Sequence, residues 1–257
     1  MIRIEPEQWR ASQAGNMLMI FEAAVWCLLA TSTLLIGAWI TFRFQPSSRV
    51  VGLVMGFGAG AMISAVAYEL FPETSRNLLA FIALGLGAIM FYCGTSWIER
   101  RSQAKGMAGA NAQAQTGRAI VLGALLDGIP ESLVLGMTFA IGGAVSLAFF
   151  GAVLVSNLPE SISASAEMER GGMTRRRIST IWLAIILISV LSTIIGVVLV
   201  QTVPRVTGIY AMALAGGAVL AMLADTMIPE GFHEGGKPTA LLVVLGFAFA
   251  AMLGVLG

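Results

Sequence analysis

Two short stretches place acids, an amide, hydroxyls and prolines inside apolar segments. They are Leu126-Asp127-Gly128-Ile129-Pro130-Glu131-Ser132 and Val155-Ser156-Asn157-Leu158-Pro159-Glu160-Ser161. An acidic side chain at the centre of a membrane helix costs about 2.5–3.5 kcal/mol on insertion scales. Carboxylates at such positions are therefore expected to face a polar interior and to have a specific role. Carboxylate, amide and hydroxyl oxygens are also the ligands that hard divalent cations prefer.

The pattern of these two stretches occurs four times in the chain. In each copy a polar residue and a glutamate stand four positions apart, with proline directly before the glutamate; the copies are Glu69–Glu73, Asp127–Glu131, Ser156–Glu160 and Thr226–Glu230. Residues four apart on a helix share a face, so each copy presents two polar groups in one direction. Four copies in four different segments favour internal repetition of the kind found in transporters, including inverted repeats.

Composition indicates that these motifs lie in a membrane. Of the 257 residues 57% are hydrophobic and 11% are charged, and the mean hydropathy is +0.86. A membrane crossing needs about 20 apolar residues, and a crossing segment must satisfy its own backbone hydrogen bonds, which favours helices. The expected helices are 17–40, 50–71, 78–98, 118–141, 144–168, 178–203, 208–231 and 239–256. The predicted fold is all-α: a polytopic membrane protein whose single transmembrane domain, 1–257, is an eight-transmembrane-helix bundle with an internal inverted repeat.

The distribution of arginine and lysine predicts the orientation of this bundle. Eleven of the 15 lie in the connections that follow odd-numbered segments, and four lie on the other side. Cytoplasmic loops are enriched in these residues, so both termini are expected outside. The long connection at about 99–117 is then expected to be a mobile cytoplasmic linker. The expected location is the plasma membrane, which in a bacterium is the inner membrane.

Depth along the helices brings the two central motifs together. At 1.5 Å per residue, Asp127 and Glu160 lie about 13 and 12 Å from the cytoplasmic ends of the fourth and fifth segments. On the same basis Glu131 lies at about 20 Å and Ser156 at about 18 Å. If the two antiparallel helices face each other, Asp127 is level with Glu160, and Glu131 is level with Ser156 and Asn157. The sequence therefore predicts an oxygen-rich cage near the midplane, which suits a divalent cation.

These motifs, in an eight-segment chain with a long connection after the third segment, resemble the ZIP family of divalent metal transporters. Members of that family build their transport site from the fourth and fifth helices and carry zinc, iron or other divalent transition metals into the cytoplasm. The resemblance implies that Asp127, Glu131, Asn157 and Glu160 occupy metal-ligand positions. It also implies that the metal is the transported substrate and that no separate cofactor is needed.

The sequence departs from the family pattern in its histidines. Asp127-Gly128 stands where family members typically show His-Asn, and Ser156 stands where an opening histidine or another polar ligand is common. The chain has one histidine, His233. A site without imidazole loses much of its preference for zinc, so manganese, ferrous iron or a broad divalent specificity is as well supported. The number of ions in the site, one or two, is left open.

The outer copies of the motif predict a route to and from the cage. Glu69 and Glu73 lie near the external end of the second segment, where acidic side chains concentrate cations. Candidates for the inner part of the route are the metal ligands Asp225, Glu230 and His233, with Glu234 and Glu167 as further exit-path residues. An ordinary interfacial role is the alternative for His233.

The same residues bear on other functions and partners. Buried carboxylates also serve as proton relays, so a proton- or sodium-coupled cation exchanger is the alternative function. An enzyme is not expected, because His233-Glu234 lacks the second histidine of a zinc-protease motif. Nucleic acid is not an expected partner, since no basic run with interleaved aromatics accompanies the net charge of +1. The row Gly52, Gly56 and Gly60 predicts close helix packing, either within the chain or in a homodimer.

Overall fold

The computed structural model describes residues 6–70, 78–104, 111–202 and 205–256. These residues form helices and short connections, and they contain no strand. Seven of the helices are long and apolar enough to cross a membrane, and an eighth apolar helix, Thr239–Val255, is shorter. The predicted all-α fold with eight apolar helices is confirmed at this level. The internal inverted repeat stays a prediction.

Two of the eight segments are built from more than one kind of helix. In chain order the elements are α1 (Pro6–Phe44), α2 (Ser48–Ala65), the π-helix η1 (Val66–Leu70), α4 (Leu78–Ala104), α5 (Asn111–Gly142), α6 (Leu147–Arg170), α7 (Arg175–Thr202), α8 (Arg205–Met222), the π-helix η2 (Leu223–Met227), α9 (Ile228–Gly235) and α10 (Thr239–Leu256). The second segment is therefore α2 with η1, and the seventh is α8 with η2 and α9. Helices α5 and α6 continue through Pro130 and Pro159.

The predicted linker at 99–117 is shorter than expected. Helix α4 extends to Ala104 and α5 begins at Asn111, so helix covers most of that range. Alanine, glutamine and arginine are frequent there and are good helix formers, so the low hydropathy of this stretch does not exclude a helix. The remaining residues, 105–110, lie outside the described part of the chain.

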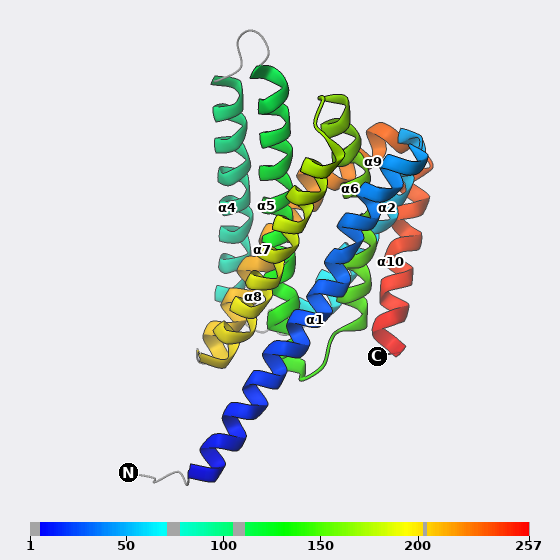
Figure 1. The fold of residues 1–257 in the computed structure, drawn as a ribbon. Coiled ribbons are helices and arrows are strands. Elements are labelled where there is room, and N and C mark those ends of the chain that lie inside the picture. Colours follow the sequence, from blue (N-terminus) through cyan, green and yellow to red (C-terminus); the bar gives the residue numbers. More distant parts are fainter. Residues whose placement is uncertain (1–5, 71–77, 105–110, 203–204, 257) are drawn as a thin grey trace.

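The helices pack in one bundle in which most of the closely packed pairs run parallel, because they join two odd-numbered or two even-numbered segments. Helix α2 packs against α10 and α6, α1 against α6 and α7, α5 against α7, and α4 against α8. The start of α1 and the end of α10 lie at the same end of the bundle, and the connections from α1 to α2 and from α6 to α7 lie at the opposite end (Figure 1). The location of both chain ends on one side of the bundle agrees with an even number of membrane-crossing segments. Which end faces the cytoplasm stays a prediction.

The glycine row of α2 is a packing surface within the chain. Gly52 lies against the backbone of Gly235, and a side chain at Gly60 would overlap the carbonyl of Val243 on α10. Small residues allow helix backbones to approach this closely. The interpretation of the row as an intramolecular seam is confirmed, whereas a homodimer through some other surface stays a prediction.

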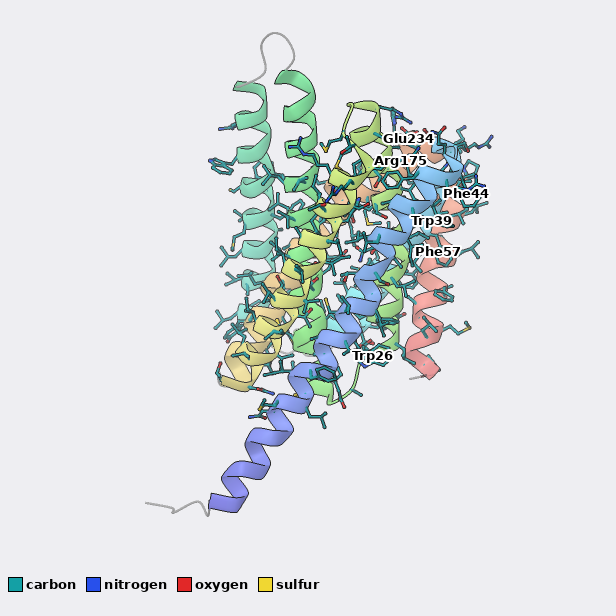
Figure 2. The ribbon with its side chains drawn as sticks, in the orientation of Figure 1. Trp26, Trp39, Phe44, Phe57, Arg175 and Glu234 are labelled. Atoms are coloured by element: carbon teal, nitrogen blue, oxygen red, sulfur yellow. The ribbon has the colours of Figure 1, made fainter. Side chains whose placement is uncertain are left out.

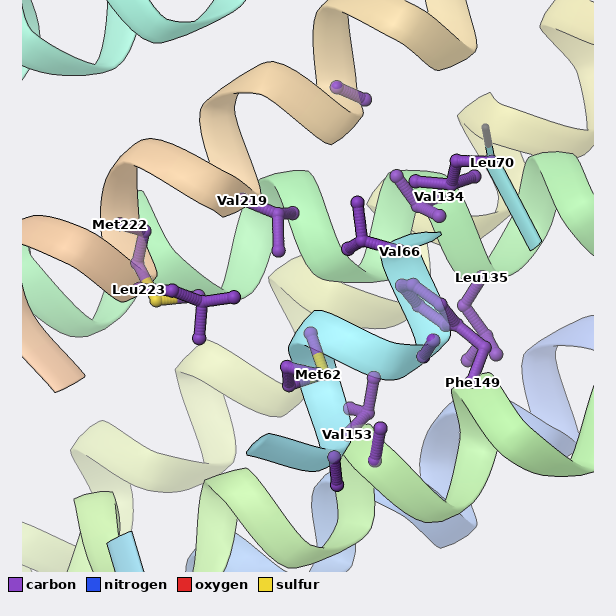
Figure 3. Packing of buried hydrophobic residues seen from close by; sticks show 14 of the residues in the cluster. Met62, Val66, Leu70, Val134, Leu135, Phe149, Val153, Val219, Met222 and Leu223 are labelled. Atoms are coloured by element: carbon purple, nitrogen blue, oxygen red, sulfur yellow. The ribbon is translucent and has the colours of Figure 1, made fainter. Parts of the chain in front are cut away.

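A buried apolar core joins the centre of the bundle. Met62 of α2 and Val66 of η1 pack among Leu135 of α5, Phe149 of α6 and Met222 of α8, all of them almost fully buried (Figure 3). A second cluster surrounds Trp182 of α7 and joins α7 to α1, α5 and α6. The Trp182 indole N–H donates to Ser165 Oγ on α6 at 2.9 Å. These contacts hold α5 and α6 on two sides of a small cavity.

Candidate functional site

A small cavity lies where α1, α5, α6 and α7 meet. Its volume is about 10 Å³, close to the least that holds one water molecule. Six oxygen-bearing side chains line it, together with Gly128 and four apolar residues: Thr31, Glu131, Ser132, Asn157, Glu160 and Ser189, with Leu34, Ala124, Trp182 and Ile185. The structure therefore brings three of the predicted site residues, Glu131, Asn157 and Glu160, to one space.

The cavity lies at mid-depth of the helices that form it. Glu131 is near the middle of the apolar span Val121–Gly142, and Glu160 is near the middle of Leu147–Arg170. Ser189 is near the middle of Arg175–Thr202. Glu131 is only 2% exposed, so its carboxyl group is enclosed by protein rather than by lipid.

Further carboxylates stand close to this cavity without lining it. Asp127 lies near enough to Glu230 and Asp225 to interact with them electrostatically. Glu160 interacts in the same way with Asp127, Glu131 and Glu230. Like charges repel strongly where the surroundings have a low dielectric constant. A cation or protons that neutralise this group of carboxylates would therefore stabilise it.

The carboxylates are not arranged as a ready-made metal cluster. Among the described residues, no three histidine, cysteine, aspartate or glutamate side chains are grouped so that they could hold a metal ion. The cavity itself contains two carboxylates, those of Glu131 and Glu160. A cation bound there would need further ligands from amide and hydroxyl oxygens.

Ser156 faces away from the cavity that its neighbour lines. Its hydroxyl donates to the Val153 carbonyl at 3.1 Å, and its Cα lies 2.9 Å from where a Cβ on Gly58 would stand. Successive residues of an α-helix point about 100° apart, so Asn157 facing the cavity turns Ser156 toward α2. Ser156 therefore faces α2 and does not lie beside Glu131, where the sequence predicted it.

A larger opening, which we call the vestibule, begins about one helical turn from Glu160. It has a volume of about 440 Å³ and lies between the connection from α1 to α2 and the last turns of α6. Its lining residues are Thr41, Gln45, Pro46, Ser48, Val51, Ile162, Ser163, Ala166, Glu167, Glu169, Arg170 and Glu234. Glu234 lies toward the same end of the bundle as Arg175 (Figure 2). Two predicted exit-path residues, Glu167 and Glu234, thus line this opening.

A hydrogen bond connects the vestibule to the carboxylates around the cavity. Ser163, which lines the vestibule, donates from Oγ to Oε1 of Glu230 at 2.7 Å. Ser163 is three residues beyond Glu160 on α6, a rise of about 4.5 Å along the helix axis. Glu230 is half-buried, and it interacts both with Ser163 of the vestibule and with Glu160 of the cavity.

The remaining predicted residues are more peripheral. Asp225 is exposed and lines a separate groove of about 400 Å³ beside Phe91 and Tyr92 of α4. The His233 side chain is 82% exposed, and its Nδ1 lies 3.1 Å from Glu234 Oε1. Glu69 belongs to η1, and Glu73 lies outside the described residues.

Sequence reasoning missed the hydroxyl side of the cavity. Three hydroxyl residues line it, Thr31 of α1, Ser132 of α5 and Ser189 of α7. Thr31 and Ser189 belong to no recurring motif, and Ser132 directly follows the motif residue Glu131. A hydroxyl at the middle of a long apolar segment was the available signal. That signal does not reveal which segments are neighbours.

Comparison with known proteins adds no relative to this picture. No family model matches the sequence, and the comparison with curated proteins gives no match. The resemblance to the ZIP family therefore rests on the motifs themselves and on the pattern of eight apolar segments.

Proposed function

We propose that the chain transports a divalent metal cation, such as zinc, iron or manganese, across the membrane into the cytoplasm. The observation that carries the proposal is the mid-span cavity that Glu131, Asn157 and Glu160 share. Two carboxylates match the charge of a divalent ion, and the amide oxygen adds a neutral ligand. In this proposal Glu131 and Glu160 bind the ion through charge, and Asn157 orients it.

The size of the cavity supports binding of an ion that has lost most of its water. A space of about 10 Å³ has room for a particle the size of one water molecule but not for a hydrated ion. Oxygen atoms from the cavity wall must then replace the hydration shell. The electrostatic gain from two enclosed carboxylates offsets the cost of removing that water.

The vestibule supplies one half of a transport route. Its acidic residues Glu167 and Glu234 attract cations, and Glu230 interacts with both the vestibule residue Ser163 and the cavity residue Glu160. Transport further requires that the cavity be exposed to the two sides in turn. Helix α5 packs mainly against α7, and α6 packs mainly against α1 and α2. A shift between these groups would change the distance between Glu131 and Glu160, and so would change the affinity for the ion.

Uptake of manganese, iron and zinc by cells or proteoliposomes tests the proposal. The variants Glu131→Gln and Glu160→Gln keep side-chain size and remove the charge, so uptake is expected to fall to background at normal membrane insertion. Glu22→Gln is the matched control, because Glu22 is an exposed carboxylate of α1 outside the site. Wild-type uptake by both cavity variants would contradict the proposed site.

The group of interacting carboxylates also suits a proton- or sodium-coupled cation exchanger. Metal binding by the purified protein separates the two functions. A metal transporter of this kind binds manganese or zinc at micromolar concentrations and loses that binding with Glu131→Gln. Sodium- or proton-driven flux by a protein that binds no divalent metal would favour the exchanger.

A further inference from the structure

Half of the oxygen-bearing side chains around the cavity are hydroxyls. Thr31, Ser132 and Ser189 come from three different helices and lie among the residues that line the cavity. Each of the three residues is only 2% exposed. Together they form what we call the hydroxyl wall of the cavity, whose other oxygen-bearing side chains are Glu131, Asn157 and Glu160.

The surroundings of two of these hydroxyls are defined in the structure. Thr31 Oγ1 donates its proton to the Cys27 carbonyl at 2.7 Å, and it also contacts the Cys27 thiol. A hydroxyl oxygen has two lone pairs, so one is left to bind a cation. Ser189 Oγ lies 3.5 Å from the place that a Cβ on Gly128 would take. Since Gly128 has no side chain, the Ser189 hydroxyl reaches the backbone of α5 at the cavity.

The ligand types at the cavity surface favour one class of cation. Two carboxylates, one amide and three hydroxyls offer six oxygen ligands, and the lining residues include no thiol, thioether or imidazole. Six oxygen ligands suit manganese or magnesium, whereas zinc prefers four ligands that include nitrogen or sulfur. The cavity is too small to hold an additional shell of water, so the wall must supply nearly all the ligands.

We propose that the hydroxyls of Thr31, Ser132 and Ser189 complete a six-coordinate, all-oxygen site that discriminates in favour of a hard divalent cation, manganese or magnesium, against zinc and cadmium. The inference rests on the proposed function and names the substrate class of that same site. Softer metals generally bind protein ligands more tightly than manganese, so such a preference has to come from ligand type and geometry. The hydroxyl wall supplies both.

Binding of Mn²⁺ to the detergent-purified full chain, followed by electron paramagnetic resonance, is the direct test, with Cd²⁺ as the competitor. Thr31→Cys and Ser189→Cys replace a hydroxyl oxygen with sulfur at almost constant size. Each is expected to raise the ratio of Cd²⁺ affinity to Mn²⁺ affinity by about tenfold or more, because thiolate is a soft ligand.

Matched controls lie on the same two helices. Thr33 and Ser192 are buried, but their hydroxyls donate to the carbonyls of Ala30 and Ile188, and neither residue lines the cavity. Thr33→Cys and Ser192→Cys are expected to leave the ratio within about twofold, a free-energy change of about 0.4 kcal/mol. The Cys27 thiol contacts the Thr31 and Ser132 side chains, so all variants and their reference protein carry Cys27→Ala, which removes the thiol that Thr31→Cys would otherwise meet.

A second pair of variants keeps the test independent of any folding defect of the cysteine variants. Thr31→Ser retains the hydroxyl and is expected to keep Mn²⁺ binding, whereas Thr31→Val is expected to weaken it by about tenfold, as loss of a supporting ligand contact does. Both proteins must elute as monodisperse peaks.

The outcomes separate this inference from the proposed function. If wild type binds Mn²⁺, Glu131→Gln abolishes that binding and the cavity cysteines shift the ratio no more than the control cysteines, the hydroxyl wall has no role in selectivity and the inference fails alone. If wild type binds neither Mn²⁺ nor Cd²⁺, the proposed function fails as well. A shift confined to Thr31→Cys and Ser189→Cys supports both.

Discussion

Ser163 and Glu230 are the two residues that connect the vestibule to the cavity. Their hydrogen bond, 2.7 Å from Ser163 Oγ to Glu230 Oε1, joins α6 to α9. The Glu230 carboxylate also interacts electrostatically with Glu160 of the cavity. In the proposed transporter this pair positions the carboxylate next to the cavity on its vestibule side.

Ser163→Ala is therefore expected to impair uptake without abolishing it. Loss of one hydrogen bond to a partly buried carboxylate corresponds to about 1 kcal/mol, which is about a fivefold increase in the apparent KM for the metal. Ser163→Thr keeps the hydroxyl and is expected to restore the wild-type value. Thr180→Ala is the control, because the exposed Thr180 hydroxyl donates only to the Arg176 carbonyl of its own helix. An unchanged KM for Ser163→Ala would show that the bond has no part in uptake.

The sequence predicted the residues of the cavity that belong to a motif and missed those that do not. Glu131, Asn157 and Glu160 were predictable because they belong to motifs on two consecutive helices. The depth estimate paired Glu160 with Asp127, whereas the cavity joins Glu160 to Glu131 and Asn157. Thr31 and Ser189 depend on α1 and α7 packing against α5 and α6, and no spacing within one segment contains that information. Ser156 shows the limit of depth alone, since it lies at the right level but faces α2.

At the level of elements, proline has different consequences in different copies of the motif. Helices α5 and α6 continue as α-helix through Pro130 and Pro159, whereas the π-helical turn η2 ends at Met227, two residues before Pro229. Proline removes a backbone donor in every case, but the helix responds according to its neighbours. The eight segments were predictable from apolar length, whereas the π-helical turns and the helical extension of α4 to Ala104 were not.

The contact between α5 and α7 is an element-level feature that can be tested with one glycine. A Cβ at Gly136 of α5 would overlap the Thr193 carbonyl of α7, so Gly136→Ala must push the two helices apart. The expected cost is about 1–3 kcal/mol, the range for overpacking, and it should appear as a lower unfolding temperature of the purified protein. Because α5 carries Glu131 and Ser132 and α7 carries Ser189, metal binding should weaken as well.

The control for this prediction lies on the same helix. No atom stands within 4 Å of a Cβ added at Gly123, so Gly123→Ala is expected to leave the packing unchanged. Alanine also favours helix over glycine by about 1 kcal/mol, so this variant should be at least as stable as wild type. Equal unfolding temperatures for the two variants would contradict the close α5–α7 contact.

At the scale of the whole molecule, the vestibule opens at the arginine-rich end. Arg175, at the start of α7, pairs with Glu169 of α6 at 2.8 Å, and its guanidinium carbon lies 5.3 Å from the centre of the Phe42 ring of α1. These contacts hold the connection from α6 to α7 beside the vestibule. In the predicted orientation this end faces the cytoplasm, so the described conformation has its larger opening toward the cytoplasm.

Labelling of single cysteines from one side of the membrane tests that orientation. Cys27 is fully buried and Cys93 is exposed, so Cys93→Ser provides a background of low reactivity. In that background Arg176→Cys reports on the arginine-rich end and Ala144→Cys on the end that carries the termini; both residues are exposed. Because the cytoplasmic side retains most of the arginines and lysines, a membrane-impermeant maleimide should label Ala144→Cys in intact cells and Arg176→Cys only after permeabilisation. The reverse pattern would place the vestibule outside and would make it the entry of the proposed route instead of its exit.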